Sequence, residues 1–195
     1  MKKRIGIQGF LVFASLAVIV LFAKYLFAGR RPGGLDTALA AAGLVLIVAG
    51  FITRVVSRGF KAEGSSDGKT LVRRGPYALV RNPMYAGTFL IGAGIIVALL
   101  KWWVFFVFAG LYCAIYVPQV KKEERVLAER FGKEYRGYCR ETPRFFPRPA
   151  RFFSTPPGEY LRFKWEWVKK ELPSFIAVTV ALVIILYYTH GRATG

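Results

Sequence analysis

The feature that most constrains this chain is the alternation of long apolar stretches with strongly basic connecting segments. Five stretches have, or nearly have, the roughly 17–25 apolar residues that a helix needs to cross a bilayer. They are residues 9–28, 35–56, 84–100, 102–117 and 174–189. Hydrophobic residues make up 54% of the 195 residues, yet the formal charge is +18. A soluble domain is rarely both so apolar and so basic, whereas a membrane protein combines apolar spans with basic loops.

These stretches predict an all-α fold, a polytopic membrane bundle of about five helical spans. Residues 9–28 follow a basic N-terminal tip, as a signal peptide would, but the run is too long for a signal core and two arginines follow it. We therefore expect a retained membrane helix. The third and fourth stretches are short and only Lys101 separates them, which predicts a tight helical hairpin. Gly50 in the second stretch and Gly87, Gly92 and Gly94 in the third predict close helix approach.

The basic residues are distributed unevenly around the predicted spans. Most of the 29 Lys and Arg residues lie at the N-terminal tip, in residues 54–81 or in residues 121–170. The positive-inside rule then places the N-terminus and both long loops in the cytoplasm, and the C-terminus outside. A basic chain can also bind nucleic acid. Because these charges flank apolar spans, anionic lipid headgroups are the more economical partner, and we predict no nucleic-acid partner.

The inventory of reactive side chains excludes several kinds of site. His190 is the only histidine, so a histidine-based metal centre and a Ser-His or Cys-His nucleophile pair are excluded. Cys113 lies in an apolar run and Cys139 in a basic stretch, and neither suggests a disulfide or a metal site. We therefore predict no metal ligands.

The first polar patch is Arg74-Gly75-Pro76-Tyr77-Ala78-Leu79-Val80-Arg81-Asn82-Pro83-Met84-Tyr85-Ala86-Gly87, which leads directly into the third apolar stretch. Asn82 is a good N-cap, and Pro83 fits the first turn of a helix. The simplest interpretation is a capped membrane helix with basic anchors. The run also gathers polar groups where a helix N-terminus meets water, and such a terminus attracts anions.

The second polar patch follows the fourth stretch. It runs from Glu123 to Tyr138, as EERVLAERFGKEYRGY, and is followed by Arg144-Phe145-Phe146-Pro147. The spacing predicts a helix over residues 121–140, with Glu124, Leu127, Phe131, Tyr135 and Tyr138 on one face. Taken alone, this pattern favours an amphipathic interfacial helix with solvated charges.

Together the two patches resemble the paired signature of the isoprenylcysteine carboxyl methyltransferase family, which is related to the phospholipid methyltransferases. The first matches Gly-Pro-Tyr followed by Val-Arg-His/Asn-Pro-x-Tyr-x-Gly. The second matches Glu-Glu-x-x-Leu-x-x-x-Phe-Gly-x-x-Tyr-x-x-Tyr followed by Arg-x-x-Pro. The resemblance covers residues 72–147, with the predicted hairpin between the motifs. Asn82 stands where eukaryotic members of the family carry histidine.

The resemblance implies a site for S-adenosyl-L-methionine at the cytoplasmic end of the hairpin. It assigns cofactor contacts to residues of both patches: Val80, Asn82, Tyr85, Gly87, Glu124, Tyr135, Tyr138 and Pro147. It assigns catalytic roles to Glu124 and Arg144, and Arg144 is a candidate partner for a substrate carboxylate. Because an amide does not titrate, Asn82 can bind the cofactor but cannot take the acid or base role of a histidine.

The chemistry implied by the resemblance is transfer of a sulfonium methyl group to a substrate that enters from the membrane. Such a transfer needs alignment and exclusion of water, and a carboxylate or thiolate acceptor needs no general base. A prenyl-cysteine carboxylate, a lipid headgroup and a thiol stay open as acceptors. Two other functions also stay open: a non-catalytic basic membrane protein that binds anionic lipid or a partner, and a membrane reductase with a nicotinamide cofactor.

The predicted organisation has three parts. Residues 1–70 hold the first two spans and a loop, and residues 71–147 hold the signature region with the hairpin and the cytoplasmic helix. Residues 148–195 combine an aromatic and basic segment, suited to the headgroup region, with the C-terminal span.

Overall fold

The computed structural model describes residues 34–65, 69–99, 101–154 and 156–190, the last range with gaps at 161 and 163. Within these ranges the chain forms helices and no strands, which confirms the predicted all-α class. The predicted first span, residues 9–28, lies outside the described residues. The helices are α3 (Gly34–Gly64), α4 (Pro76–Leu79), α5 (Pro83–Leu99), α6 (Trp102–Glu141), α7 (Pro149–Ser154), α8 (Pro157–Tyr160) and α9 (Trp165–His190).

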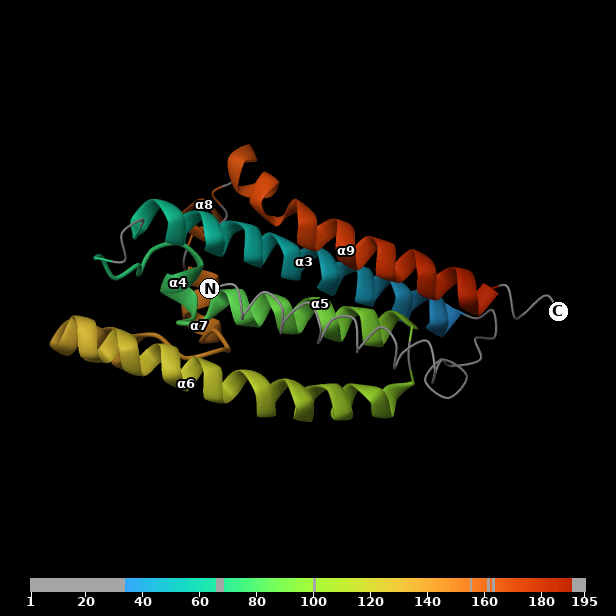
Figure 1. The fold of residues 1–195 in the computed structure, drawn as a ribbon, viewed down its shortest axis with the longest axis horizontal. Helices are drawn as coiled ribbons and strands as arrows, with labels where there is room; N and C mark the ends of the chain where they lie inside the picture. Colours follow the sequence, from blue (N-terminus) through green and yellow to red (C-terminus); the bar gives the residue numbers. More distant parts are fainter. Residues whose placement is uncertain are drawn as a thin grey trace, which may run out of the picture.

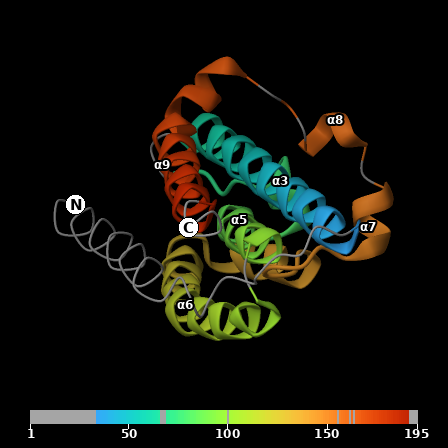
Figure 2. The ribbon, with the colours of Figure 1, turned by 90° about the vertical axis from the view of Figure 1, so that its right-hand side faces the viewer.

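Four long helices pack side by side, with α5 between α3 and α6 and with α9 on α3 (Figures 1 and 2). Ile47 and Phe51 of α3 form a small buried cluster with Ile91 of α5, and Val178 of α9 packs against it. The ring of Phe51 also meets that of Phe175 edge to face, with centroids 5.0 Å apart. The core is therefore built along α3, which contacts both α5 and α9.

Glycines let α3 and α5 approach at backbone distance. A Cβ added to Gly94 would lie 2.5 Å from the carbonyl oxygen of Gly43, and one added to Gly50 would lie 2.7 Å from that of Gly87. The two pairs are seven residues apart on both helices, so the contact repeats after two helical turns. This arrangement confirms the predicted close approach at Gly50 and Gly87.

Aromatic side chains join α5 to α6. Phe89 stacks on Phe108 with ring centroids 5.5 Å apart and meets Tyr112 edge to face at 5.1 Å. The Tyr112 hydroxyl also donates to the Tyr85 carbonyl, with an oxygen–oxygen distance of 2.6 Å. These contacts hold the C-terminal part of the first patch against the helix that carries the second.

One prediction about α6 is wrong in its boundaries. The sequence pattern predicts separate segments over residues 102–117 and 121–140, whereas in the structure α6, Trp102–Glu141, continues through residues 118–120 without a break and is kinked at Gly132. Pro118 lies inside this helix. A proline removes one helical hydrogen bond, and here the helix continues despite that loss. The regular backbone is interrupted further on, at Gly132, where φ is 51°. The second patch is thus the direct continuation of an apolar helix.

Two described helices are long and apolar enough to cross a membrane. They comprise Thr37–Gly64 and Trp102–Glu141, while the apolar segments Pro83–Ala98 and Glu171–Val180 are shorter. Large apolar side chains such as Val45, Phe106 and Leu111 are exposed on these helices, which suits contact with lipid. The predicted total of five spans, the membrane hairpin and the cytoplasmic orientation stay predictions.

Candidate functional site

Backbone hydrogen bonds join the two polar patches. The Arg81 amide donates to the Pro143 carbonyl at 2.8 Å, and the Asn82 amide donates to the Arg144 carbonyl at 3.2 Å. These two bonds hold the segment before α5 against the segment after α6. The Tyr138 hydroxyl adds a third link, since it donates to the Tyr77 carbonyl at 2.7 Å.

Glu124 is the side chain on which both patches converge. It is 8% exposed and accepts a 3.1 Å hydrogen bond from the Asn82 amide. Arg144 binds it in a bidentate manner, with Nη2 at 2.7 Å from Oε2 and Nε at 3.1 Å from the same oxygen and 3.2 Å from Oε1. Arg81 Nη1 lies 3.3 Å from Oε1. This ion pair and its hydrogen bonds raise the pKa of Arg144 above its ordinary value. The buried carboxylate is thus fully compensated.

Glu123 forms a second polar contact beside the first. Its Oε1 accepts hydrogen bonds from the Tyr85 hydroxyl at 2.8 Å and from the Gln119 amide at 2.9 Å. Tyr85 also packs on the ring of Tyr116, with centroids 5.5 Å apart. Tyr85 is therefore oriented both by packing and by a charged acceptor.

A cavity of about 250 Å³ lies between the patches, and we refer to it as the enclosed cavity. Four of the predicted cofactor contacts line it: Asn82, Tyr85, Tyr135 and Tyr138. Its other lining residues are Lys61, Ser65, Thr70, Leu71, Val72, Tyr77, Arg81, Pro83, Met84, Glu123, Leu127, Arg130 and Phe131. The structure therefore brings together side chains that are more than 50 residues apart in the sequence.

Sequence analysis missed the wall of this cavity that α3 and the following segment contribute. The sequence predicts only two spans and a loop for residues 1–70, yet Lys61, Ser65 and Thr70 line the cavity. Lys61 lies in the last turn of α3, which extends to Gly64, eight residues beyond the end of the predicted apolar stretch. A helical interpretation continued past residue 56 would have found this wall.

Other predicted site residues lie outside the lining. Gly87 faces Gly50 at the α3–α5 contact, Val80 is buried, and Pro147 is exposed. Glu124 and Arg144 also lie outside the lining of the enclosed cavity. Glu124 is linked to the lining by its hydrogen bond from Asn82, and Arg144 binds Glu124.

Two buried polar atoms at this site, Tyr135 Oη and Arg81 Nε, have no hydrogen-bond partner of ordinary geometry within the described ranges, although the Cys139 thiol neighbours the Tyr135 hydroxyl. Tyr135 is 3% exposed, and its burial, together with the neighbouring Glu124 carboxylate, raises the pKa of its hydroxyl well above 10. Burial raises the pKa of Tyr77 and of Tyr138 in the same direction. All three side chains therefore remain neutral hydrogen-bonding groups at neutral pH, and an unmet buried hydroxyl favours a polar ligand.

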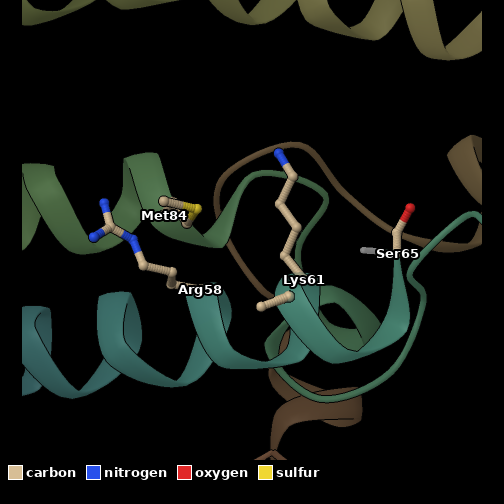
Figure 3. A pocket seen from close by; sticks show the side chains of 5 residues that line it. Arg58, Lys61, Ser65 and Met84 are labelled. Carbon is tan, nitrogen blue, oxygen red and sulfur yellow. The ribbon is translucent and has the colours of Figure 1, made fainter. Parts of the chain in front are cut away.

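A second cavity of about 460 Å³ adjoins the first and is more open, and we refer to it as the open cavity. It is lined by Arg58, Lys61, Ala62, Ser65 and Met84. Arg58 and Lys61 extend from α3 toward the side on which Met84 lies at the start of α5 (Figure 3). Lys61, Ser65 and Met84 belong to both cavities, so the two spaces share a wall.

Comparison with known proteins adds a family match. The model of the phospholipid methyltransferase family matches residues 38–134, from α3 to the second patch, which confirms the predicted resemblance to this group of enzymes. The match includes α3, which sequence analysis treated as a generic span. It ends before Tyr135, Tyr138 and Arg144. No solved structure matches the chain at a significant level.

Two curated relatives carry names that refer to metal resistance. The cobalt-zinc-cadmium resistance protein CzcN of Cupriavidus metallidurans is 40% identical over 81 residues, which cover 40% of this chain and 36% of that protein. The nickel-cobalt-cadmium resistance protein NccN of Alcaligenes xylosoxydans xylosoxydans is 31% identical over 123 residues, which cover 61% of this chain and 56% of that protein. The chain thus matches between about a third and just over half of the length of these relatives.

Proposed function

Because residues 38–134 match the model of the phospholipid methyltransferase family, we propose that this chain is an S-adenosyl-L-methionine-dependent methyltransferase whose acceptor partitions into the bilayer. The observation that carries the proposal is the enclosed cavity, where both polar patches meet. A structural helix cap and a solvated interfacial helix, the simpler interpretations of the two patches, would not require a shared cavity with an unmet buried hydroxyl.

The residues around the enclosed cavity suit this cofactor chemically. Five aromatic rings line it, those of Tyr77, Tyr85, Phe131, Tyr135 and Tyr138. Aromatic faces attract organic cations, and a sulfonium is such a cation. The unmet Tyr135 hydroxyl and the Asn82 amide offer hydrogen bonds to its polar groups. The cavity is slightly smaller than the roughly 300–1,000 Å³ typical of ligand sites, and the adjoining open cavity adds room.

Glu124 acts in this proposal as a positioning residue. Both of its oxygens already accept hydrogen bonds from Arg144, and Oε1 also accepts one from Asn82. A carboxylate so occupied is poorly placed to remove a proton from an acceptor. Its function is to fix the Asn82 amide at the cavity and to hold the Arg144 guanidinium nearby, where Arg144 is a candidate partner for an anionic substrate.

The reaction then places few demands on acid or base groups. S-adenosylmethionine, when bound, supplies a methyl group on a positively charged sulfur that a nucleophile can accept directly. The protein's part is to align the two reactants and to exclude water. The tyrosines stay neutral and both oxygens of Glu124 are occupied, so neither is placed to deprotonate an acceptor, which favours a carboxylate or thiolate acceptor over a protonated amine.

The membrane arrangement completes the proposal. Around the two long apolar helices, we propose five spans in total, with α5 and the first part of α6 as a hairpin and the N-terminus in the cytoplasm. The cavities then lie at the cytoplasmic end of the bundle, beside the basic segments. The cofactor would enter from the cytoplasm and the acceptor from the lipid.

The proposal is tested by calorimetric titration of the purified full chain in neutral detergent with S-adenosylhomocysteine, the product form of the cofactor. We expect saturable binding, and we expect Tyr135→Phe to weaken it about 5- to 10-fold, because one hydrogen bond of about 1–1.5 kcal/mol is lost. Tyr160→Phe, in α8 and away from both cavities, is the matched control and should leave the affinity unchanged.

Two results would overturn this assignment. One is a folded wild-type chain that gives no heat and no thermal shift with S-adenosylhomocysteine. The other is saturable binding of a reduced nicotinamide cofactor in the same assay, with no binding of S-adenosylhomocysteine. This result would favour the membrane reductase. Binding of anionic vesicles alone, abolished by salt, would favour a non-catalytic lipid-binding protein.

A further inference from the structure

Among the described residues, the lining of the open cavity includes two cationic side chains and no acidic one. The two cationic residues are Arg58 and Lys61. Lys61 is exposed in the last turn of α3 and has no ion-pair partner in the part of the chain that the structure describes. Figure 3 shows its ammonium group at the end of an extended side chain that leaves α3 on the same side as Arg58. An anion placed there would meet the Lys61 ammonium group and the guanidinium of Arg58, whose Nε is paired with Glu171.

Arg58 is oriented from outside the region of the family match. Its Nε lies 2.8 Å from Oε1 of Glu171 in α9, and Glu171 is 1% exposed. Arg54 Nη2 lies 3.2 Å from the other carboxylate oxygen. Because Glu171 holds the Nε edge of the guanidinium, the rest of the group is fixed at the edge of the open cavity. An arginine held in this way offers its remaining donors in a defined direction.

The location of the open cavity favours an amphiphile over a soluble anion. Ile52, an exposed apolar residue of α3, precedes Arg58 by six residues, about 9 Å along the helix axis. Leu44, Val45 and Val48 extend the exposed apolar surface toward the other end of α3. Along the axis of α3, a headgroup at Arg58 and Lys61 would therefore lie just beyond the exposed apolar part of the helix, at its basic C-terminal end.

We propose that the open cavity binds the anionic headgroup of the methyl acceptor, a lipid-like phosphate or carboxylate. Lys61 contacts the headgroup directly, and Arg58 contacts it in an orientation set by Glu171. This proposal deepens the proposed function. It rests on that function for the identification of the bound anion as the methyl acceptor. The wall shared by the two cavities, at Lys61, Ser65 and Met84, places this headgroup next to the donor side of the site.

The test uses two single-chain probes with the same ten-carbon alkyl tail, decyl phosphate and undecanoate, and decyl maltoside as the neutral reference. Each is titrated calorimetrically into the full chain in a neutral detergent at low salt. We expect saturable binding of at least one anionic probe, and the stronger of the two identifies the headgroup as phosphate or carboxylate. Lys61→Ala should weaken that binding about tenfold and leave decyl maltoside unaffected. Lys133→Ala, an exposed lysine of α6 outside both cavities, is the control.

Arg58 is tested by Arg58→Lys, which keeps the charge near Glu171 and removes the fork of donors. We expect a three- to tenfold loss of affinity for the preferred anionic probe, with a thermal unfolding midpoint within a few degrees of the wild-type value. The same affinity in Arg58→Lys and Lys61→Ala as in the wild-type chain would overturn the proposal.

A parallel titration with S-adenosylhomocysteine separates the two proposals. If Lys61→Ala weakens S-adenosylhomocysteine binding and leaves the anionic probes unaffected, Lys61 serves the carboxylate of the cofactor and the acceptor assignment is wrong. If the wild-type chain binds the anionic probes but not S-adenosylhomocysteine, the anion site stands and the methyltransferase function fails. Binding of neither anionic probe by folded protein overturns the anion site alone.

Discussion

Asn82 directly precedes α5, as the sequence predicts, but its partners could not be predicted from the sequence. The sequence identifies it as an N-cap before Pro83 and as a cofactor contact by resemblance. In the structure its backbone amide binds Arg144 O, its side chain binds Glu124, and it lines the enclosed cavity. The Glu124 contact joins residues 42 positions apart, and no local pattern specifies such a partner. The resemblance named Asn82 and Glu124 as site residues, whereas the hydrogen bond between them is visible only in the structure.

Tyr135 supports a prediction about pH. Burial raises the pKa of its hydroxyl in the folded state, whereas in the unfolded chain tyrosine ionises near 10. Below pH 10 both states are protonated, so this group adds no pH dependence. Above pH 10 the unfolded state loses a proton that the folded state keeps, so stability falls as pH rises, by up to about 1.4 kcal/mol per unit for each such tyrosine.

The measurement is the free energy of unfolding of wild type and Tyr135→Phe in mixed micelles between pH 8 and 11. The phenylalanine variant loses no hydrogen bond to the described residues, so it should fold. We expect the two curves to be parallel below pH 10 and the wild-type curve to fall more steeply above it. Parallel curves over the whole range would show that the Tyr135 hydroxyl titrates in the folded state as it does in water.

At the scale of elements, the sequence predicted the existence of the helices better than their ends. The predicted stretch 84–100 corresponds to helix α5, Pro83–Leu99, with a difference of one residue at each end. The stretch at 35–56 became Gly34–Gly64, and 174–189 became Trp165–His190, because amphipathic turns continue each helix beyond its apolar part. Hydropathy finds the portion of a helix that suits lipid, and it does not register the polar turns in which Lys61 and Glu171 lie.

The glycine contact between α3 and α5 gives a prediction for this scale. Gly94→Ala places a methyl group 2.5 Å from the Gly43 carbonyl oxygen, so the two helices must move apart. We expect a loss of about 1–3 kcal/mol in the free energy of unfolding, the usual cost of inserting atoms into a packed contact. The measurement is chemical unfolding in mixed micelles followed by circular dichroism.

Gly110→Ala, in α6, is the matched control because no atom of the described residues lies within 4 Å of an added Cβ. There the greater helix propensity of alanine should leave stability unchanged or raise it by up to about 1 kcal/mol. Equal effects of the two substitutions would mean that α3 and α5 are not held at backbone distance in the micelle.

At the scale of the whole molecule, the notable connection is between the family region and α9. Trp167 is buried against Val55 and Val56 of α3, and its indole N–H donates to Glu63 at 3.2 Å. Glu171, one turn further, pairs with Arg54 and Arg58. The sequence predicted a C-terminal span with no link to the signature. It could not predict this docking, because the residues concerned lie more than 100 positions apart and outside any shared motif.

The docking makes Glu171 the most sensitive test of the whole arrangement. Glu171→Gln removes the charge that compensates Arg54 and Arg58, while Arg54 keeps its hydrogen bond to Thr88 of α5. Removing one partner of a buried ion pair costs about 3–5 kcal/mol, and the amide and the partial exposure of Arg58 should reduce this to about 2–3 kcal/mol. The measurement is the free energy of unfolding, followed by tryptophan fluorescence that includes Trp167.

Glu166→Gln provides the comparison within the same helix. Glu166 is exposed and pairs with Lys169 at 3.2 Å, so its loss should change stability by less than about 0.5 kcal/mol. If Glu171→Gln is equally mild, α9 is held by apolar packing alone and its carboxylate does not organise α3. If it is severe, the C-terminal helix is part of the structure that shapes the open cavity, because the same carboxylate that fastens α9 also orients Arg58 at its edge.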